Sequence, residues 1–244
     1  MARVAVVTGA SSGFGVEIAR RLASRGDLCI LIARRADRLE ALVADLDGAL
    51  AVTCDVANDA DLERLVSETL AAHGRIDLLV NNAGIGTPIA AEDEPIDEFR
   101  RVVDVNLNAL FALSQLVGRQ MIAQGHGNII NIASVLGLVA SAPIKQASYT
   151  ASKGAVVNLT RELAVQWARK GVRVNAIAPG WFPSEMTTEM FEVGPAADYL
   201  KRNAPMGRGG EVHELDGALL FLASGASSYV TGQVITVDGG WVAR

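Results

Sequence analysis

The chain is short of cysteine and histidine and has no excess of positive charge. Its 244 residues include two cysteines, Cys29 and Cys54, and both lie in apolar runs, which predicts buried free thiols in a reducing compartment rather than disulfides. The three scattered histidines make no metal-ligand spacing with the cysteines, so no metal site is expected. The formal net charge is −5 and there is no basic block, which argues against a nucleic-acid partner.

The sequence predicts neither a targeting segment nor a membrane span. The first residues run directly into a glycine motif, without the charged leader and apolar core of a signal peptide. One uncharged stretch, 127–144, is almost long enough to cross a bilayer. It contains several polar residues and Pro143, and its apolar part has the length of a strand. We therefore expect a cytoplasmic protein without membrane contact.

Hydrophobic periodicity predicts strands that alternate with helices. Short aliphatic runs predict strands at 4–7, 28–32, 50–54, 76–80, 128–133, 172–178 and 233–237. Apolar residues at helical spacing predict helices near 15–22, 39–46, 62–70, 96–123, 149–171 and 212–223. This alternation predicts a three-layer α/β fold, in which a doubly wound, Rossmann-like parallel sheet of about seven strands carries helices on both faces.

One irregular region interrupts this alternation. The stretch 179–210 holds four of the seven prolines, and a long break of this kind in a compact domain is typical of a lid or a binding loop. No linker divides the chain. We therefore expect residues 1–244 to form one domain, with a substrate lid at about 181–210.

A glycine-rich turn follows the first predicted strand. From Thr8 the chain reads Thr-Gly-Ala-Ser-Ser-Gly-Phe-Gly, which differs from the G-x-G-x-x-G dinucleotide fingerprint. Glycines between a strand and a helix let backbone N–H groups approach a pyrophosphate, and the helix N-terminus favours its negative charge. Alone, the turn is equally typical of a tight connection between a strand and a helix.

Tyr149 and Lys153 lie four residues apart at the start of a predicted helix, so their side chains share one face. A free tyrosine has a pKa of about 10, and a nearby positive charge lowers it. The pair therefore suits proton transfer. The same spacing is common on solvated helix faces. Other residues of the chain must therefore distinguish a catalytic pair from two solvent-exposed side chains.

Taken in order, a set of short motifs resembles the single-domain short-chain dehydrogenase/reductases, including members similar to 3-oxoacyl-carrier-protein reductases and gluconate dehydrogenases. The motifs are Thr8-Gly-x-x-x-Gly13-x-Gly15, Asp55-Val56, Asn81-Asn82-Ala83-Gly84, Asn106, Ser134, Tyr149-x-x-x-Lys153 and Pro179-Gly180. The resemblance runs from about Val4 to Gly240. It implies an NAD(P)-dependent oxidoreductase that transfers a hydride between a nicotinamide and a ketone or secondary alcohol.

The resemblance implies four catalytic residues. Tyr149 would be the general acid in carbonyl reduction and the base in alcohol oxidation. Lys153 would lower the pKa of that phenol and hold the nicotinamide ribose. Ser134 would hydrogen-bond the substrate oxygen, and Asn106 would hold a water that links Lys153 to solvent. Ser148, directly before the tyrosine, is a weaker candidate for the role of Ser134.

The resemblance also implies a cofactor site that draws on most of the motifs. The glycine turn would meet the pyrophosphate, the residues after the third and fourth strands would meet the adenosine, and those after the sixth strand would meet the nicotinamide carboxamide. The residues concerned are Gly9, Ser11, Ser12, Gly13, Phe14, Gly15, Asp55, Val56, Asn82, Ala83, Gly84, Pro179, Gly180, Phe182 and Ser184, together with Tyr149 and Lys153.

Two arginines predict a preference for NADP over NAD. Arg34 and Arg35 directly follow the second strand, where an acidic residue holds the ribose 2′-hydroxyl of NAD and an arginine accommodates a 2′-phosphate. Arg34 is favoured because it lies nearer the strand end, and a guanidinium can bind a phosphate bidentately. Ser12 is neutral where many NADP-preferring relatives carry a base, and Asp37 can turn toward the ribose. Solvated arginines at a helix start remain the alternative.

The expected partners are a small carbonyl or alcohol substrate, partly apolar, and further copies of the chain in a homotetramer. The lid offers an apolar set that indicates the nature of the pocket, namely Trp181, Phe182, Met186, Met190, Phe191 and Met206. Two helices carry additional apolar positions that predict subunit contacts, namely Val105, Leu107, Leu110, Phe111, Val157, Leu159 and Thr160. A catalytically silent, nucleotide-binding redox sensor is the alternative to an enzyme.

Overall fold

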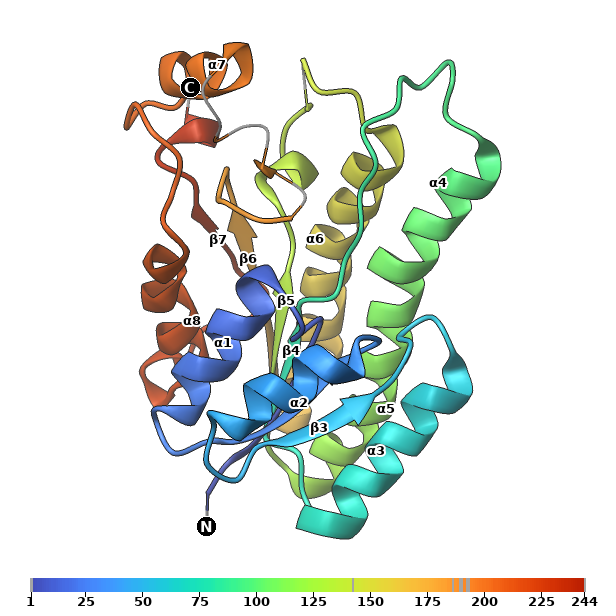
Figure 1. Cartoon of the computed structure of the whole chain (residues 1–244). Coiled ribbons are helices and arrows are strands. Elements are labelled where there is room, and N and C mark those ends of the chain that lie inside the picture. Colours follow the sequence, from blue (N-terminus) through green and yellow to red (C-terminus); the bar gives the residue numbers. More distant parts are fainter. Residues whose placement is uncertain (1, 142, 186, 189–190, 192–193, 244) are drawn as a thin grey trace.

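Seven parallel strands form one sheet in the order β3-β2-β1-β4-β5-β6-β7 (Figure 1). The computed structural model describes residues 2–141, 143–185, 187–188, 191 and 194–243. The strands are β1 Val4–Thr8, β2 Leu28–Ala33, β3 Leu50–Thr53, β4 Leu78–Asn81, β5 Gly127–Ile132, β6 Val172–Pro179 and β7 Val234–Val237. The predicted seven-stranded, Rossmann-like α/β fold is confirmed.

Helices cover both faces of the sheet (Figure 1). One face is packed by α1 Gly13–Ala23, α2 Ala36–Ala44 and α8 Asp216–Ala223, and the other by α3 Asp59–His73, α5 Ala109–Gln124 and α6 Ala147–Trp167. In β1, Ala5 and Val7 point into the first layer and Val4 and Val6 into the second. Strands buried on both faces need apolar residues at every position. None of the helices in the described ranges combines the length and apolar character needed to cross a bilayer.

The long helix predicted at 96–123 is divided in two. It consists of α4 Ile96–Val103, a π-helical turn η1 at Asp104–Asn108, and α5. A π turn inserts an extra residue into the helix and is frequent at functional sites. Here it contains Asn106, which is fully buried. The expectation of one uninterrupted helix is therefore wrong at this point.

The region predicted as irregular contains a helix that sequence reasoning missed. Helix α7 spans Pro195–Asn203, with Pro195 at its start and Ala197 and Leu200 buried. Proline is common in the first turn of a helix, because the missing N–H would have no partner there. That proline was the available signal. The helix predicted at 212–223 begins instead with a 3-10 turn, η5 Val212–Leu215, and continues as α8.

A ladder of buried polar side chains crosses the middle of the sheet. Asn81 on β4 pairs in register with Asn131 on β5, and the Asn81 Nδ2 donates to the Oδ1 of Asn131 at 2.9 Å. The ladder extends to Ser114 on α5 and Thr160 on α6, both at 2.9 Å. Each buried amide therefore has partners, as a low-dielectric interior requires. The ladder ties both central strands to the helices that carry the site.

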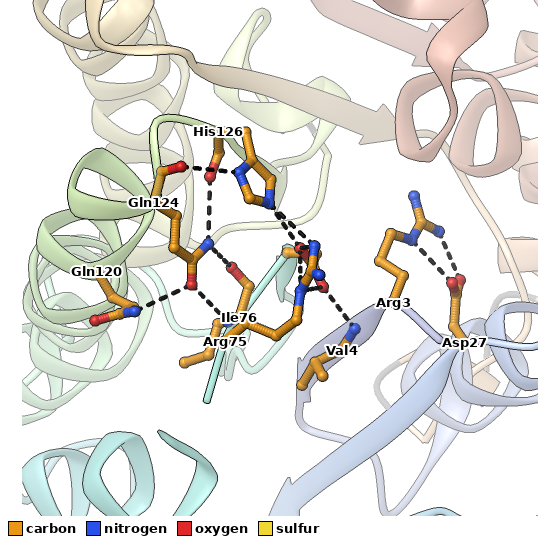
Figure 2. A network of polar contacts seen from close by, with 9 residues as sticks. Arg3, Val4, Asp27, Arg75, Ile76, Gln120, Gln124 and His126 are labelled. Carbon is orange, nitrogen blue, oxygen red and sulfur yellow. Dashed lines mark hydrogen bonds and ion pairs between the residues drawn. The ribbon is translucent and has the colours of Figure 1, made fainter. Parts of the chain in front are cut away.

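The amino-terminal edge of the sheet has its own polar network (Figure 2). The Asp77 carboxylate accepts from Arg75 and from the backbone N–H of Val4 at 2.8 Å, and His126 Nε2 lies 3.0 Å from it. Gln124 bridges to the backbone of Ile76. These contacts hold β1, β4 and the start of β5 together at the edge opposite the carboxyl ends of the strands.

Candidate active site

A cavity of about 720 Å³ opens at the carboxyl edge of the sheet, around the ends of β1, β2, β4, β5 and β6. Open α/β sheets bind ligands at the carboxyl ends of their strands, near the point where the order of the strands reverses. The volume of the cavity lies in the range of ligand pockets. All predicted site residues line the cavity except Gly15 and Asn106. The predicted set is thus gathered in one place.

The glycine turn after β1 is held in a shape that only glycine allows. Gly9 and Gly13 have positive φ values of 67° and 53°. A Cβ on Gly15 would lie 2.1 Å from the carbonyl oxygen of Gly9, so Gly15 serves the turn from behind the cavity wall. Helix α1 starts here with neither a side-chain cap nor an acidic residue in its first turn. Its free N–H groups suit an anion.

Thr8 fixes the turn after β1 to the turn after β4, a role that sequence reasoning did not assign. Its Oγ1 accepts from the backbone N–H groups of Asn82 and Ala83, both at 3.0 Å. The Asn82 Nδ2 donates back to the Thr8 carbonyl at 3.0 Å. A Cβ on Gly9 would lie 2.9 Å from Ala83 Cα. The two turns therefore form one rigid wall of the cavity.

Tyr149 and Ser134 both line the cavity, and the Ser134 hydroxyl is close enough to lower the pKa of the phenol. Ser134 follows β5, and its Oγ accepts from the N–H of Leu136 at 3.1 Å, which fixes its position. Ser148 is fully buried and donates to Glu94 instead. Of the two serines considered, Ser134 is the one that contacts the phenol.

Lys153 lies on the same face of α6 as Tyr149. Its Nζ donates to the carbonyl oxygen of Ile132 at 2.7 Å and lies 5.7 Å from the centroid of the Tyr149 ring. The side chain is only 3 % exposed. Burial disfavours the charged form and lowers the pKa of Lys153 to about 8.

The expectation that Lys153 lowers the pKa of Tyr149 is wrong for the protein alone. Burial raises the pKa of Tyr149 above its usual value, and the nearby Ser134 hydroxyl offsets only part of that rise. The lysine ammonium is directed at the Ile132 carbonyl, and its own pKa is depressed. The phenol therefore carries its proton at neutral pH.

Two glycines after β4 set the space around these groups. A Cβ on Gly86 would lie 2.8 Å from Cδ2 of Tyr149, so the backbone there lies against the ring. A Cβ on Gly84 would lie 3.4 Å from both Asn106 Oδ1 and Lys153 Nζ. Sequence reasoning did not single out Gly86. Its close contact is with the ring of Tyr149, which lies far along the chain, so only the folded structure shows why a side chain does not fit there.

Asn106 holds the loop after β4 against α6. Its Oδ1 accepts from the N–H of Ile85 at 2.8 Å, and its Nδ2 donates to the Ile85 carbonyl at 2.8 Å and to Ser152 Oγ at 3.0 Å. The π turn aims this amide inward. Asn106 therefore positions the loop that carries Gly84 and Gly86.

The arginines after β2 occupy different positions. Arg34 is exposed, lines the cavity, and has no hydrogen-bond or ion-pair partner among the residues described. Arg35 donates to Ser11 Oγ at 3.1 Å and to Ser12 Oγ at 2.8 Å. It also reaches Glu185 at 3.3 Å. One guanidinium is thus available at the cavity wall, and the other is anchored to the glycine turn.

The start of the predicted lid packs against the glycine turn. Phe182 meets Phe14 edge to face, with ring centroids 5.4 Å apart. Trp181 joins a buried apolar cluster with Val135, Leu136, Leu200, Ala204 and Trp241, against which Tyr149 and Phe191 also pack. Met206 is 65 % exposed, and the predicted lid residues Met186 and Met190 lie outside the described residues.

Comparison with known proteins identifies the family. A family model described as enoyl-(acyl carrier protein) reductase matches residues 9–242. Galactitol 2-dehydrogenase (L-tagatose-forming) of Cereibacter sphaeroides is 43% identical, over 97% of this chain and 94% of that protein. The chain belongs to the short-chain dehydrogenase/reductase family. Gluconate 5-dehydrogenase of Gluconobacter oxydans is another similar member, 40% identical over 97% of this chain and 93% of that protein.

A solved structure of the same family is similar throughout. It is a gluconate 5-dehydrogenase from Burkholderia cenocepacia in complex with NADP and tartrate, with a TM-score of 0.93 and 38% identity, over 99% of this chain and 96% of that chain. The predicted class is thereby confirmed: this short-chain dehydrogenase/reductase is an oxidoreductase that acts on alcohol or carbonyl groups with a nicotinamide cofactor.

The residues around the cavity fit such a cofactor. Glycines at positions 9 and 15 let the turn pack closely against the turn after β4, and the uncapped start of α1 offers backbone donors to a pyrophosphate. Arg34 and Arg35 lie at the same wall as the end of β2. The described residues contain no group of three or more side chains that could hold a metal ion.

Proposed function

We propose that this short-chain dehydrogenase/reductase interconverts small secondary alcohols and ketones with a preference for NADP(H), and that Tyr149 is its general acid-base. The observation that carries this proposal is the placement of Tyr149, Ser134 and Lys153, the last one turn further along α6, at the wall of the cavity that also contains the glycine turn. A phenol, a hydroxyl and an ammonium converge there.

The residues of the chain divide the proton chemistry among them. When bound, the nicotinamide supplies the hydride for reduction or accepts it in oxidation. Ser134 holds the substrate oxygen by a hydrogen bond, within reach of the phenol. In reduction Tyr149 gives its proton to that oxygen, and in oxidation it takes the proton back. Lys153, charged below its pKa of about 8, stabilises the phenolate.

Asn106 and the loop glycines support this arrangement. By holding Ile85 and Ser152, Asn106 keeps the loop after β4 against α6. We assign it in addition the water that links Lys153 to solvent, since the Oδ1 of Asn106 accepts only one hydrogen bond from the described residues and has a second lone pair available.

The cofactor assignments follow the lining of the cavity. Backbone groups of Gly9, Ser11, Ser12, Gly13 and Phe14 would hold the pyrophosphate, with Gly15 packed behind them. Asp55, Val56, Asn82, Ala83 and Gly84 would hold the adenosine, and Pro179, Gly180, Phe182 and Ser184 the nicotinamide. The preference for NADP rests on Arg34, whose guanidinium lies at the cavity wall without a protein partner among the described residues.

The surroundings of Tyr149 and the names of similar proteins bear on the kind of alcohol or ketone that the protein uses. The apolar cluster beside Tyr149 supports a substrate with an apolar part, whereas the similar proteins are named for galactitol and gluconate. We place residues 181–210, including α7, as the lid over this end of the cavity. The proposal includes a homotetramer and a cytoplasmic location, the latter because both cysteines are buried free thiols.

A panel of carbonyls and alcohols tests the proposal. Polyols, sugar acids, cyclic ketones and 3-oxoacyl thioesters would each be supplied with NADP(H) or NAD(H), and turnover followed by the absorbance of the reduced nicotinamide. We expect at least one class to turn over, with a higher kcat/KM for NADP(H). Tight cofactor binding without turnover of any class would favour the silent redox sensor instead.

A further inference from the structure

Glu185 lies between two arginines at the edge of the cavity. Its carboxylate accepts from Arg38 at 2.6 Å and from Arg35 at 3.3 Å, so it bridges the residues that follow β2 to the start of the predicted lid. The hydrogen bond from Arg38 and the charge of Arg35 lower the pKa of Glu185 below its usual value. The group is therefore an anion at neutral pH.

Glu185 shares its arginine with the glycine turn. The Arg35 guanidinium contacts Ser11 and Ser12 through two of its nitrogens and Glu185 through the third. Arg34, Arg35 and Glu185 all line the same cavity. A phosphate at this wall would accept hydrogen bonds from Arg34 and Arg35. Of these two, Arg35 is already paired with the Glu185 carboxylate.

We propose that Glu185 is a specificity-determining residue that competes with the 2′-phosphate of the cofactor for Arg35. This inference rests on the proposed preference for NADP(H). For Arg35 to turn toward a phosphate, it must release Glu185, and the lid segment that carries Glu185 loses a tether to the β2 end. A cofactor without the 2′-phosphate leaves the ion pair intact.

The expected effect has a definite sign. Replacing the carboxylate with an amide of the same shape weakens the competition for Arg35, because a neutral amide oxygen accepts a weaker hydrogen bond, and it removes the repulsion between Glu185 and a phosphate dianion. Glu185 is 57 % exposed, and water screens exposed pairs strongly. We therefore expect Glu185→Gln to tighten binding of a 2′-phosphate ligand by about three- to tenfold, rather than by orders of magnitude.

Two nucleotide fragments separate the 2′-phosphate from the rest of the cofactor. Binding of 2′,5′-ADP and of 5′-AMP would be measured by calorimetry on the full chain, for the wild type, Glu185→Gln and the control Glu40→Gln. Glu40 is an exposed acid on α2, in the helix that carries Arg38, and has no ion-pair partner in the described part of the chain. We expect tighter 2′,5′-ADP binding in Glu185→Gln alone, with 5′-AMP unchanged in all three.

Other outcomes overturn the inference. If Glu185→Gln left both fragments unchanged, or shifted both equally, Glu185 would be only a surface ion pair. If both fragments bound more weakly, its role would be to hold the lid. Arg34→Gln tests the underlying preference separately: if it bound 2′,5′-ADP as tightly as the wild type, the assignment of Arg34 to the phosphate would fail, while the comparison of Glu185→Gln with the wild type would still decide the role of Glu185.

Discussion

At the scale of single residues, the site depends on a phenol that is kept protonated and in place. Burial raises the pKa of Tyr149, and Ser134 and the backbone of Gly86 fix where the ring lies. The protein therefore presents an acid at neutral pH, and in the proposed mechanism oxidation requires Lys153 to make the phenolate accessible. The two directions of the reaction place different demands on the same pair.

Removing the phenol separates chemistry from binding. We expect Tyr149→Phe to lower kcat by about 10²–10⁴-fold, the usual contribution of a general acid-base, while the dissociation constant for NADP(H) stays within a few-fold. Lys153→Ala is expected to lose turnover and also to weaken cofactor binding, because we assign it both tasks. Rapid kinetics and fluorescence titration of the reduced nicotinamide measure the two quantities. A Tyr149→Phe variant that kept most of its turnover would show that the assignment is wrong.

Gly86 provides a test of position rather than chemistry. Gly86→Ala would place a methyl group 2.8 Å from Cδ2 of Tyr149, so the ring must move. Small displacements of a reacting group are costly, and we expect kcat to fall by about 10- to 100-fold, with little change in melting temperature. Gly217→Ala on α8 is the matched control, because a Cβ there meets no atom within 4 Å. Equal activities of the two variants would exclude the positioning role.

At the scale of secondary structure, the strands that are buried on both faces could be predicted from the sequence. Strands such as β1 and β6 are apolar at nearly every position, so their location was predictable to within one or two residues. The π turn at Asp104–Asn108 was not, since its extra residue is stabilised by the contacts of Asn106 with Ile85 and Ser152, which only the folded chain brings together.

The same reason explains which site residues were predictable. Ser134, Tyr149 and Lys153 belong to motifs that resemble a family, and each lines the cavity as expected. Thr8 and Glu185 were not assigned roles, because their contacts join segments far apart in the sequence. For the protein alone, the pKa of Tyr149 was predicted in the wrong direction, because the phenol is buried and the Lys153 ammonium is directed at the Ile132 carbonyl.

The network at the amino edge of the sheet gives a prediction for stability (Figure 2). Burial alone would raise the pKa of Asp77, but hydrogen bonds from Arg75, Val4 and His126 lower it below its usual value. A depressed carboxyl pKa stabilises the folded state at all pH values above the unfolded pKa, and this stabilisation is lost as the pH falls through the folded value. We therefore expect Asp77→Asn to lower the free energy of unfolding by about 1–3 kcal/mol at neutral pH.

The pH dependence makes this prediction specific. The difference between the wild type and Asp77→Asn should narrow below about pH 4, where the carboxyl of the unfolded wild-type chain begins to be protonated, and vanish as the pH falls through the lower pKa of the folded state. Urea unfolding at neutral and acidic pH measures it, with Asp47→Asn as a control, since Asp47 is exposed and has no ion-pair partner among the described residues. A difference that stayed constant from neutral to acidic pH would refute the role of the Asp77 charge.

At the scale of the whole molecule, exposed apolar side chains on two sides of the chain are available for contact with further copies. On the α5–α6 side, Phe111 is 40 % exposed and Val165 is 80 % exposed, whereas Val157, Thr160 and Leu110, which sequence reasoning assigned to subunit contacts, are buried within the chain. On the other side, Phe221 on α8 and the fully exposed Tyr229 lie in the segment that leads to β7. Only part of the predicted contact set is thus available.

The outermost strand β7 lies next in the chain after the side that carries Phe221 and Tyr229. Strand β7 pairs only with β6 in the part of the chain that the structure describes, so its outer backbone groups form an open edge. Open edges invite pairing with another chain unless they are covered. Two independent, self-complementary faces generate a tetramer with three perpendicular two-fold axes, since each face pairs one copy with a different neighbour.

We therefore expect sedimentation at micromolar concentration to show a species of four times the 25.6 kDa monomer mass. Phe111→Asp places a charge in the α5–α6 face only and should yield dimers held by the β7 side, because burying an unpaired carboxylate in an apolar contact is strongly unfavourable. Leu50→Asp is the matched control: Leu50 is 44 % exposed on β3, at the opposite edge of the sheet, and its replacement should leave the tetramer intact. A wild type that sedimented only at the monomer mass would mean that loops or solvent, rather than further copies, cover both faces.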